Sequence, residues 1–167
     1  MADHESIRKL AEALVTELTK SGKAVATAES CTGGWVAKAI TDIPGSSVVF
    51  GYGIVSYANG AKESIIGVQN KTLEKYGAVS AEVVEEMARG TLQLSGADIA
   101  VAVSGVAGPS GGTPEKPVGM VWFGWAVRDG SKAVTESSCE KFKGDRELIR
   151  EASVAYALQG VRERIRS

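Results

Sequence analysis

Histidine is nearly absent from this sequence, and the shortage limits its chemistry. His4 is the only histidine among 167 residues. A Ser-His-Asp triad, a Cys-His dyad and a histidine-rich metal centre all need histidine inside the fold, whereas His4 is expected in a frayed segment near the chain terminus. Proton transfer is therefore expected to use another group, and we expect no metal site.

Cysteines and long apolar runs are also scarce. Cys31 and Cys139 lie far apart and form no Cys-x-x-Cys pair, which argues against a disulfide scaffold and against a zinc site. No apolar run approaches the roughly 18 residues that span a bilayer, and the polar first residues do not resemble a signal peptide. We expect a cytoplasmic protein with two free thiols and no membrane partner.

The chain has no excess of charge of one sign. Nineteen basic and twenty acidic residues give a net charge of -1, so no global field would attract nucleic acid, and we expect none as a partner. An apolar content of 44% with 23% charged residues is typical of a globular protein. The length fits a single domain over residues 1–167. Self-association into a homo-oligomer is compatible with the sequence, which does not locate the surface.

Helix and strand patterns alternate along the chain. Apolar residues at helical spacing predict helices over 4–21, 32–41, 80–94 and about 145–164, with two short helices before residue 80. Apolar or β-branched runs predict strands over 24–28, 48–57, 99–103, 118–127 and 133–142. Asp129-Gly130 indicates that the last two strands form an antiparallel hairpin. The order predicts an α/β fold, a three-layer α/β/α sandwich with a mixed, mainly parallel sheet.

Small polar residues follow two of the predicted strands, at 30–34 and 104–112. Ligands of open α/β sheets bind beyond the carboxyl ends of the strands, so the two segments are expected to line one crevice. A helix that starts at Thr32 would offer free N–H groups to an anion, and a tight turn would expose Ser30. The same residues are also typical helix caps. The residues expected to contact a ligand here are Thr32, Gly33 and Gly34.

The glycine-rich stretch from Ser104 to Pro117 indicates a ligand, because so many glycines after a buried strand weaken a fold. A phosphate or a flat ring would account for them, although a mobile connection is the alternative. Residues 108–112 match the Gly-x-Ser-x-Gly elbow by letter, but prolines follow them and no histidine lies downstream. Phosphate-loop and dinucleotide fingerprints are absent.

Without histidine, a lysine or a tyrosine must assist any serine nucleophile. Tyr57 and Lys62 are five residues apart near the end of the second predicted strand, where both are able to face the crevice. A solvated lysine and a half-buried tyrosine are the ordinary alternative. Cys31 is a rival nucleophile, and the residues alone do not decide between it and Ser30. Arg146 begins the last predicted helix, where a cation is unfavourable unless an anion or a surface carboxylate accompanies it.

Seven motifs follow one another along nearly the whole chain: Ala28-Glu29-Ser30-Cys31-Thr32-Gly33-Gly34, Pro44-Gly45-Ser46-Ser47, Tyr57-Ala58-Asn59 with Lys62, Gly77-Ala78-Val79-Ser80, Ser104-Gly105-Val106-Ala107-Gly108-Pro109 with Gly111-Gly112, Lys116-Pro117-Val118-Gly119, and Gly144-Asp145-Arg146. One glycine motif is weak evidence, but seven in order are specific. On these motifs the chain resembles the CinA C-terminal-domain family, the nicotinamide-nucleotide amidohydrolases or nicotinamide mononucleotide deamidases. The competence and damage-inducible role in the family's name is not predicted by these residues.

The resemblance implies hydrolysis of the carboxamide of nicotinamide mononucleotide to nicotinate mononucleotide and ammonia, a step of NAD recycling that needs no metal or organic cofactor. It implies a small nucleotide as substrate, Ser30 as nucleophile, Lys62 as general base and Tyr57 as an assisting group. The candidates for contacts with the ring and the phosphate are Ser104, Gly105, Gly108, Gly111, Gly112 and Arg146.

Two other hypotheses stay open. The crevice would bind a nucleotide without turnover if the domain only senses a metabolite. Alternatively, the same hydrolysis would proceed with Cys31 as nucleophile. The sequence does not decide between nicotinamide mononucleotide, its riboside and the dinucleotide as the preferred substrate.

Overall fold

One mixed sheet organises the protein in the computed structural model, which describes residues 2–166. Its strands are β1 (Val25–Glu29), β2 (Phe50–Val55), β3 (Ile99–Gly105), β4 (Met120–Asp129) and β5 (Lys132–Lys141), in the spatial order β2-β1-β3-β4-β5. β1 pairs in parallel with β2 and β3, whereas β3–β4 and β4–β5 are antiparallel. The mixed sheet and the C-terminal hairpin are as predicted.

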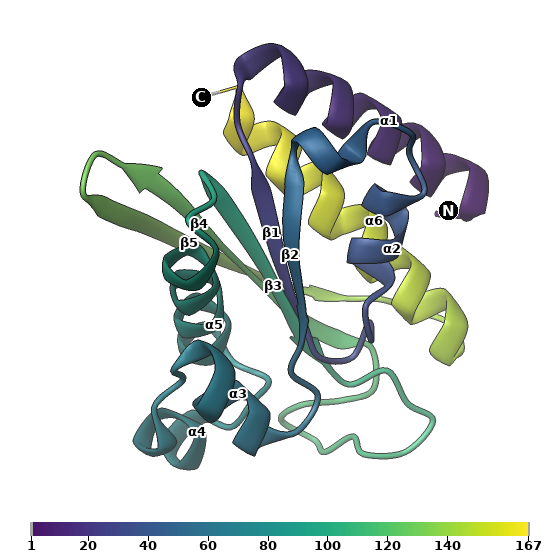
Figure 1. Ribbon diagram of the computed structural model, residues 1–167. Helices are drawn as coiled ribbons and strands as arrows, with labels where there is room; N and C mark the ends of the chain where they lie inside the picture. The colour runs from purple at the N-terminus through teal and green to yellow at the C-terminus, as the bar shows by residue number, and fades with distance from the viewer. Residues whose placement is uncertain (1, 167) are drawn as a thin grey trace.

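Helices cover both faces of this sheet, as Figure 1 shows. α1 (His4–Ser21), α2 (Trp35–Thr41) and α6 (Arg146–Ile165) lie on one face, and α5 (Ala81–Ser95) lies on the other, with α3 (Asn59–Ile66) and α4 (Asn70–Tyr76) packed beside it. A short 3-10 turn, Ser46–Val48, precedes β2. The three-layer α/β/α sandwich is therefore confirmed. No helix within residues 2–166 has both the length and the apolarity needed to cross a membrane.

The central strands are buried because helices cover both sides of them. Every residue of β1 is buried, and so are residues 99–104 of β3. Strands covered on both faces are expected to be continuously apolar rather than alternating, which is the pattern that Ile99–Val103 showed in the sequence. The two sheet faces carry separate apolar clusters, one against α1 and α6 and one against α5.

The predicted start of α2 at Thr32 is wrong. The helix begins at Trp35, because Gly33 (φ +60°) and Gly34 (φ +96°) adopt the left-handed region and a right-handed helix cannot include them. Residues 30–34 form a separate turn between β1 and α2. The predicted loop after β3 also starts too early, since Ser104 and Gly105 continue the ladder with β4.

α1 and α6 lie side by side, and ion pairs link them. Arg162 donates to Glu17 through Nε (3.1 Å) and Nη2 (2.8 Å), and Arg166 donates to the same carboxylate at 2.8 Å. The Arg162 hydrogen bond lowers the pKa of Glu17 to about 2, so this carboxylate is ionised at neutral pH. The pairing fixes α6 at its C-terminal end.

Gly124 offers a test of the packing between sheet and helix. A Cβ atom there would lie 2.3 Å from the carbonyl oxygen of Val84 in α5, so Gly124→Ala should lower the free energy of unfolding by about 1–3 kcal/mol. Gly51→Ala is the matched control, because nothing lies within 4 Å of its Cβ position. Urea denaturation followed by circular dichroism measures both, and equal midpoints for the two variants would contradict this packing.

Candidate active site

Ser30 stands at the carboxyl end of β1, where the chain leaves the sheet. Its N–H donates to Val103 O (2.9 Å), which ties it to the neighbouring strand β3, and its carbonyl accepts from Gly33 N at 3.0 Å, which closes a tight turn. The serine is partly exposed, while Thr32 within the turn is fully buried. The backbone therefore presents the Ser30 hydroxyl at the sheet edge where ligands of this fold class bind.

A buried carboxylate holds this turn against α2. Glu29 accepts from Thr32 Oγ1 (2.6 Å), from Val36 N (2.8 Å) and from Ala37 N (3.0 Å). The N–H groups at the start of a helix need acceptors, and Gly34 at the N-cap supplies no side chain. Burial raises the pKa of Glu29, and its hydrogen bonds oppose that shift. Thr32 thus bonds to the carboxylate and does not cap the helix itself.

Lys62 reaches the serine from α3 on the other side of the turn. Its Nζ atom lies 3.1 Å from Ser30 Oγ, 2.8 Å from the carbonyl oxygen of Ser56 and 3.0 Å from that of Tyr57. The residue is only 1% exposed. No carboxylate is paired with Lys62 in the part of the chain that the structure describes.

This environment suits a neutral amine. Burial lowers the pKa of Lys62 from its ordinary value of 10.5, because a low-dielectric site disfavours the ammonium form. A neutral amine has two N–H donors and one lone pair. In the neutral form, two carbonyl oxygens match the two donors and the lone pair is left for Ser30, whose hydroxyl also lies 3.5 Å from the Tyr57 carbonyl oxygen. The arrangement can take a proton from Ser30, which is what a general base does.

Cys31 is placed less favourably than Ser30. Its side chain is 6% exposed, and burial raises the pKa of its thiol to about 11. The reactive form of cysteine is the thiolate, which such a pKa makes rare at neutral pH. Lys62 Nζ hydrogen-bonds to the serine and not to the thiol.

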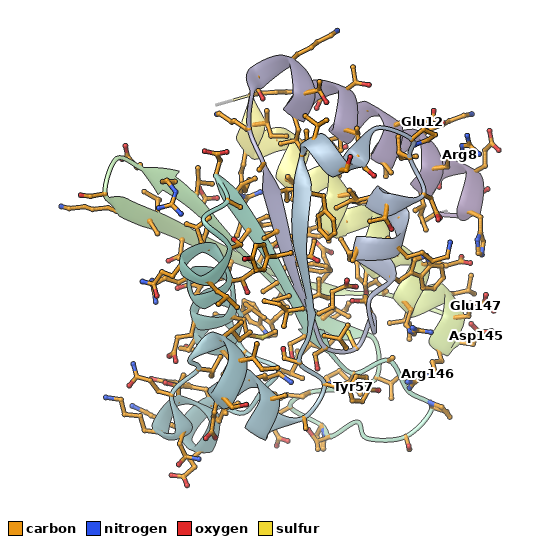
Figure 2. All side chains as sticks on the ribbon, viewed as in Figure 1. Arg8, Glu12, Tyr57, Asp145, Arg146 and Glu147 are labelled. Atoms are coloured by element: carbon orange, nitrogen blue, oxygen red, sulfur yellow. The ribbon has the colours of Figure 1, made fainter. Side chains whose placement is uncertain are left out.

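Tyr57 and Arg146 meet at the rim of the site, as Figure 2 shows. Arg146 Nη2 donates to the Tyr57 hydroxyl at 3.3 Å, and Nη1 donates to Gly108 O at 2.7 Å. Arg146 is the first residue of α6, so its contacts join that helix to the glycine-rich loop. Tyr57 as a residue is 58% exposed, and the hydrogen bond that it makes to Lys62 comes from its carbonyl oxygen and not from its hydroxyl.

Packing within the chain accounts for several of the predicted ligand-binding glycines. A Cβ atom on Gly108 would lie 2.5 Å from Val118 Cγ1, and one on Gly112 would lie 2.8 Å from Val118 N. Gly105 is similarly close to Val121 across the ladder. Gly111 has no such close neighbour, and Ser104 is buried at the end of β3. The loop folds back on residues 118–121 and lies beside Arg146.

His4 is ordered, contrary to the expectation of a frayed position. It lies in the first turn of α1, which Asp3 caps, and its Nε2 lies 3.2 Å from Glu151 Oε1. His4, Glu147 and Glu151 form the only set of three or more histidine, cysteine or acidic residues in residues 2–166 whose metal-ligating atoms lie within 4.8 Å of one another. Within this group, His4 Nε2 and Glu151 Oε1 are in direct contact, and Glu147 is exposed. None of its residues contacts Ser30 or Lys62.

Two residues of the site were missed by the sequence reasoning. Glu29 stood inside a quoted motif but received no role, although an acidic residue just before a helix is a recognisable capping signal. Arg150, in α6, donates to Cys31 O and Thr32 O at 3.1 Å each. No local pattern indicates a contact between positions more than a hundred residues apart.

Fold and site together define a class: an α/β/α sandwich with a serine–lysine pair at the carboxyl end of its sheet. Residues 7–165 match the CinA C-terminal domain, and the chain belongs to this family. It is 52% identical to the nicotinamide-nucleotide amidohydrolase PncC of Escherichia coli K12, over 95% of this chain and 94% of the relative.

Other relatives agree with this family. The chain is 50% identical to the nicotinamide-nucleotide amidohydrolase PncC of Pseudomonas putida, over 94% of this chain and 96% of the relative. Among solved structures, the competence/damage inducible protein CihA of Agrobacterium tumefaciens superposes with a TM-score of 0.91 at 41% identity, covering 100% of this chain and 99% of the other. The expected family and fold are both confirmed.

Glu29 gives a test of how the turn is held. Glu29→Gln keeps one acceptor oxygen but turns an amide group toward N–H donors, so the free energy of unfolding should fall by about 2 kcal/mol. Glu12→Gln, which breaks an exposed pair with Arg8, should change it by less than about 1 kcal/mol. Urea denaturation measures both variants; a Glu29→Gln protein as stable as Glu12→Gln would show that the carboxylate does not hold α2.

Proposed function

We propose that this protein hydrolyses the carboxamide of nicotinamide mononucleotide to nicotinate mononucleotide and ammonia. The observation that carries the proposal is the 3.1 Å contact between Lys62 Nζ and Ser30 Oγ, made by a buried lysine that has no counter-charge among residues 2–166. The relatives at about half identity over nearly the full chain are named nicotinamide-nucleotide amidohydrolases, which supports the substrate class.

In the first half of the reaction, neutral Lys62 takes the Ser30 proton as Oγ attacks the amide carbon. The carbonyl oxygen becomes an oxyanion in the tetrahedral adduct. Lys62, now an ammonium, returns the proton to the amide nitrogen, the C–N bond breaks, and ammonia leaves. An ester between Ser30 and the nicotinate carbonyl remains.

In the second half, Lys62 accepts a proton from water as the water oxygen attacks the ester. Collapse of the second adduct breaks the bond to Ser30 Oγ, which recovers its proton from Lys62. The carbonyls of Ser56 and Tyr57 keep two N–H groups of the lysine engaged throughout. Neither half uses a metal or an organic cofactor.

The remaining contacts are assigned by charge and position. Arg146 has its guanidinium at the rim between Tyr57 and Gly108 and is the candidate for the substrate phosphate. The exposed ring of Tyr57 suits the face of the cationic pyridinium, while the Tyr57 carbonyl assists by holding Lys62. Thr32, Gly33 and Gly34 are candidates for contacts with the substrate through the backbone of the turn.

Ammonia release from nicotinamide mononucleotide tests the nucleophile. Ser30→Ala should lower kcat by at least about 1,000-fold, because no covalent intermediate can form. Cys31→Ala should stay close to the wild-type rate. A coupled glutamate dehydrogenase assay measures ammonia directly. Loss of activity in Cys31→Ala with retention in Ser30→Ala would assign the reaction to the thiol, and nucleotide binding without ammonia release by the wild type would indicate a sensing module.

The pH dependence of kcat tests Lys62. Only the neutral amine accepts a proton, so kcat should rise with pH through the Lys62 pKa and level off above it, at a pH below the ordinary lysine value of 10.5. Lys62→Met should lower kcat by roughly 10²–10⁴-fold and abolish this rise. Stopped assays across pH 6–10 measure both; an unchanged pH profile in Lys62→Met would exclude lysine as the base.

A further inference from the structure

A histidine and two glutamates meet where α1 and α6 begin. His4 is the first residue of α1, and Glu147 and Glu151 lie about one turn apart on α6. An imidazole nitrogen and one carboxylate oxygen from each glutamate all lie within 4.8 Å of one another. Zinc and its neighbours among the transition metals accept these donor types. His4 was expected to be frayed and so unable to bind a metal, but the first turn of α1 holds it beside α6.

Glu151 is the buried member of this group. It is only 7% exposed, and it accepts no hydrogen bond from any residue between 2 and 166. Its one polar contact there is His4 Nε2 at 3.2 Å, which is an ion pair only when the imidazole is protonated. A buried carboxylate normally has a cation or hydrogen-bond donors around it. Beside a neutral imidazole Glu151 has neither, and a bound cation would supply the missing charge.

The spacing of these atoms fits a shared metal ion. Two ligands at roughly 2.1 Å from a tetrahedral zinc lie about 3.4 Å apart, close to the 3.2 Å between His4 Nε2 and Glu151 Oε1. Glu147 is exposed, so its side chain is able to turn its carboxylate toward the same point. The positive end of α6 also favours a carboxylate at position 147, but that interaction needs no histidine beside it. His4 is largely exposed, which leaves water access to a fourth position.

Neighbouring residues hold the imidazole in place. The ring of Trp35 lies 5.7 Å from that of His4, centroid to centroid. Asp3 caps α1 by accepting from Ser6 N at 2.8 Å, which orders the turn that carries the histidine. A ligand that is already oriented loses less entropy when a metal binds.

The cations near His4 are paired with other carboxylates. A hollow of about 300 Å³ between α1 and α2 is lined by His4, Arg8 and Lys38, among others. Arg8 contacts Glu12 at 3.0 Å, and Lys38 contacts Asp42 at 2.6 Å. These pairs reduce the repulsion that a metal ion would meet, and the hollow gives it a path to the imidazole.

We propose that His4, Glu147 and Glu151 bind one divalent transition-metal ion of the zinc class, which joins α1 to α6 at their N-terminal ends. At the other end the two helices are joined by the ion pair of Glu17 with Arg162. The ion is the counterpart of that pair and stabilises the folded chain. This site is separate from the serine–lysine pair, and it does not depend on the proposed function.

A zinc titration tests the site directly. Because His4 is the only histidine of the chain, its imidazole signals in an NMR spectrum of the tag-free protein are assigned without ambiguity. Zn²⁺ should shift these signals, and calorimetry should show saturation at one ion per chain. Zn²⁺ should also raise the melting temperature, since an ion that binds only the folded state stabilises it. Mg²⁺, which prefers oxygen ligands in octahedral geometry, should change neither.

Substitutions identify the ligands. His4→Gln and Glu151→Gln should each weaken Zn²⁺ binding at least about 10-fold and remove the rise in melting temperature, and Glu147→Gln should also weaken binding. Glu5→Gln is the matched control, because it neutralises an exposed carboxylate in the same turn of α1. Cys139→Ser removes a partly exposed thiol, the rival zinc ligand. Both controls should bind Zn²⁺ as the wild type does.

Three results would overturn the proposal. The first is a wild-type protein whose His4 signals do not change up to millimolar Zn²⁺. The second is a His4→Gln protein that binds Zn²⁺ with the wild-type affinity. The third is binding that disappears in Cys139→Ser, which would assign the ion to the thiol. Weaker binding in His4→Gln and Glu151→Gln, with wild-type binding in both controls, is the expected result.

Discussion

The burial of one amine, with no counter-charge in the described part of the chain, is the constraint on which the rest of this structure depends. Lys62 is enclosed at the end of the sheet, where its Nζ atom contacts two backbone carbonyls and the Ser30 hydroxyl. An isolated ammonium is costly in such a place, so the fold favours the neutral form that chemistry needs. The carbonyls come from the segment that follows β2, the hydroxyl from the end of β1, and the lysine from α3. The parallel pairing of β1 and β2 is what brings these pieces together.

Most of the fold was predictable because its signals are local. The apolar run Ile99–Val103 indicated a strand buried on both faces, and Asp129-Gly130 indicated the hairpin; both are present. The start of α2 was not predictable from the same signals. Thr32 looks like a helix-capping residue, but the two glycines after it adopt left-handed conformations, and the cap comes from Glu29 on the preceding strand. Helix termini depend on such contacts, which spacing alone does not reveal.

The candidate site was predictable in part, for a related reason. Ser30 and Lys62 stood out because strand ends of α/β sheets collect ligands and because histidine was lacking. Their contact joins the end of β1 to α3, and the sequence does not reveal how close these two elements lie. The glycine-rich loop was predicted to contact the ligand. Val118 and Val121 fill the space beside Gly105, Gly108 and Gly112, so packing within the chain also accounts for these glycines. Arg150 gave no signal at all, because its partners are backbone atoms, and a backbone carbonyl looks the same at every residue.

The contact between Arg150 and the turn also restricts how this sequence can vary. A Cβ atom on Gly33 would lie 3.3 Å from Arg150 Nη2, and Gly33 has a φ of +60°. Any larger residue at position 33 would strain the backbone and push against the guanidinium, while a shorter residue at 150 would leave the turn unsupported. A substitution at either position therefore changes the packing at the other, although the two lie 117 residues apart in the sequence.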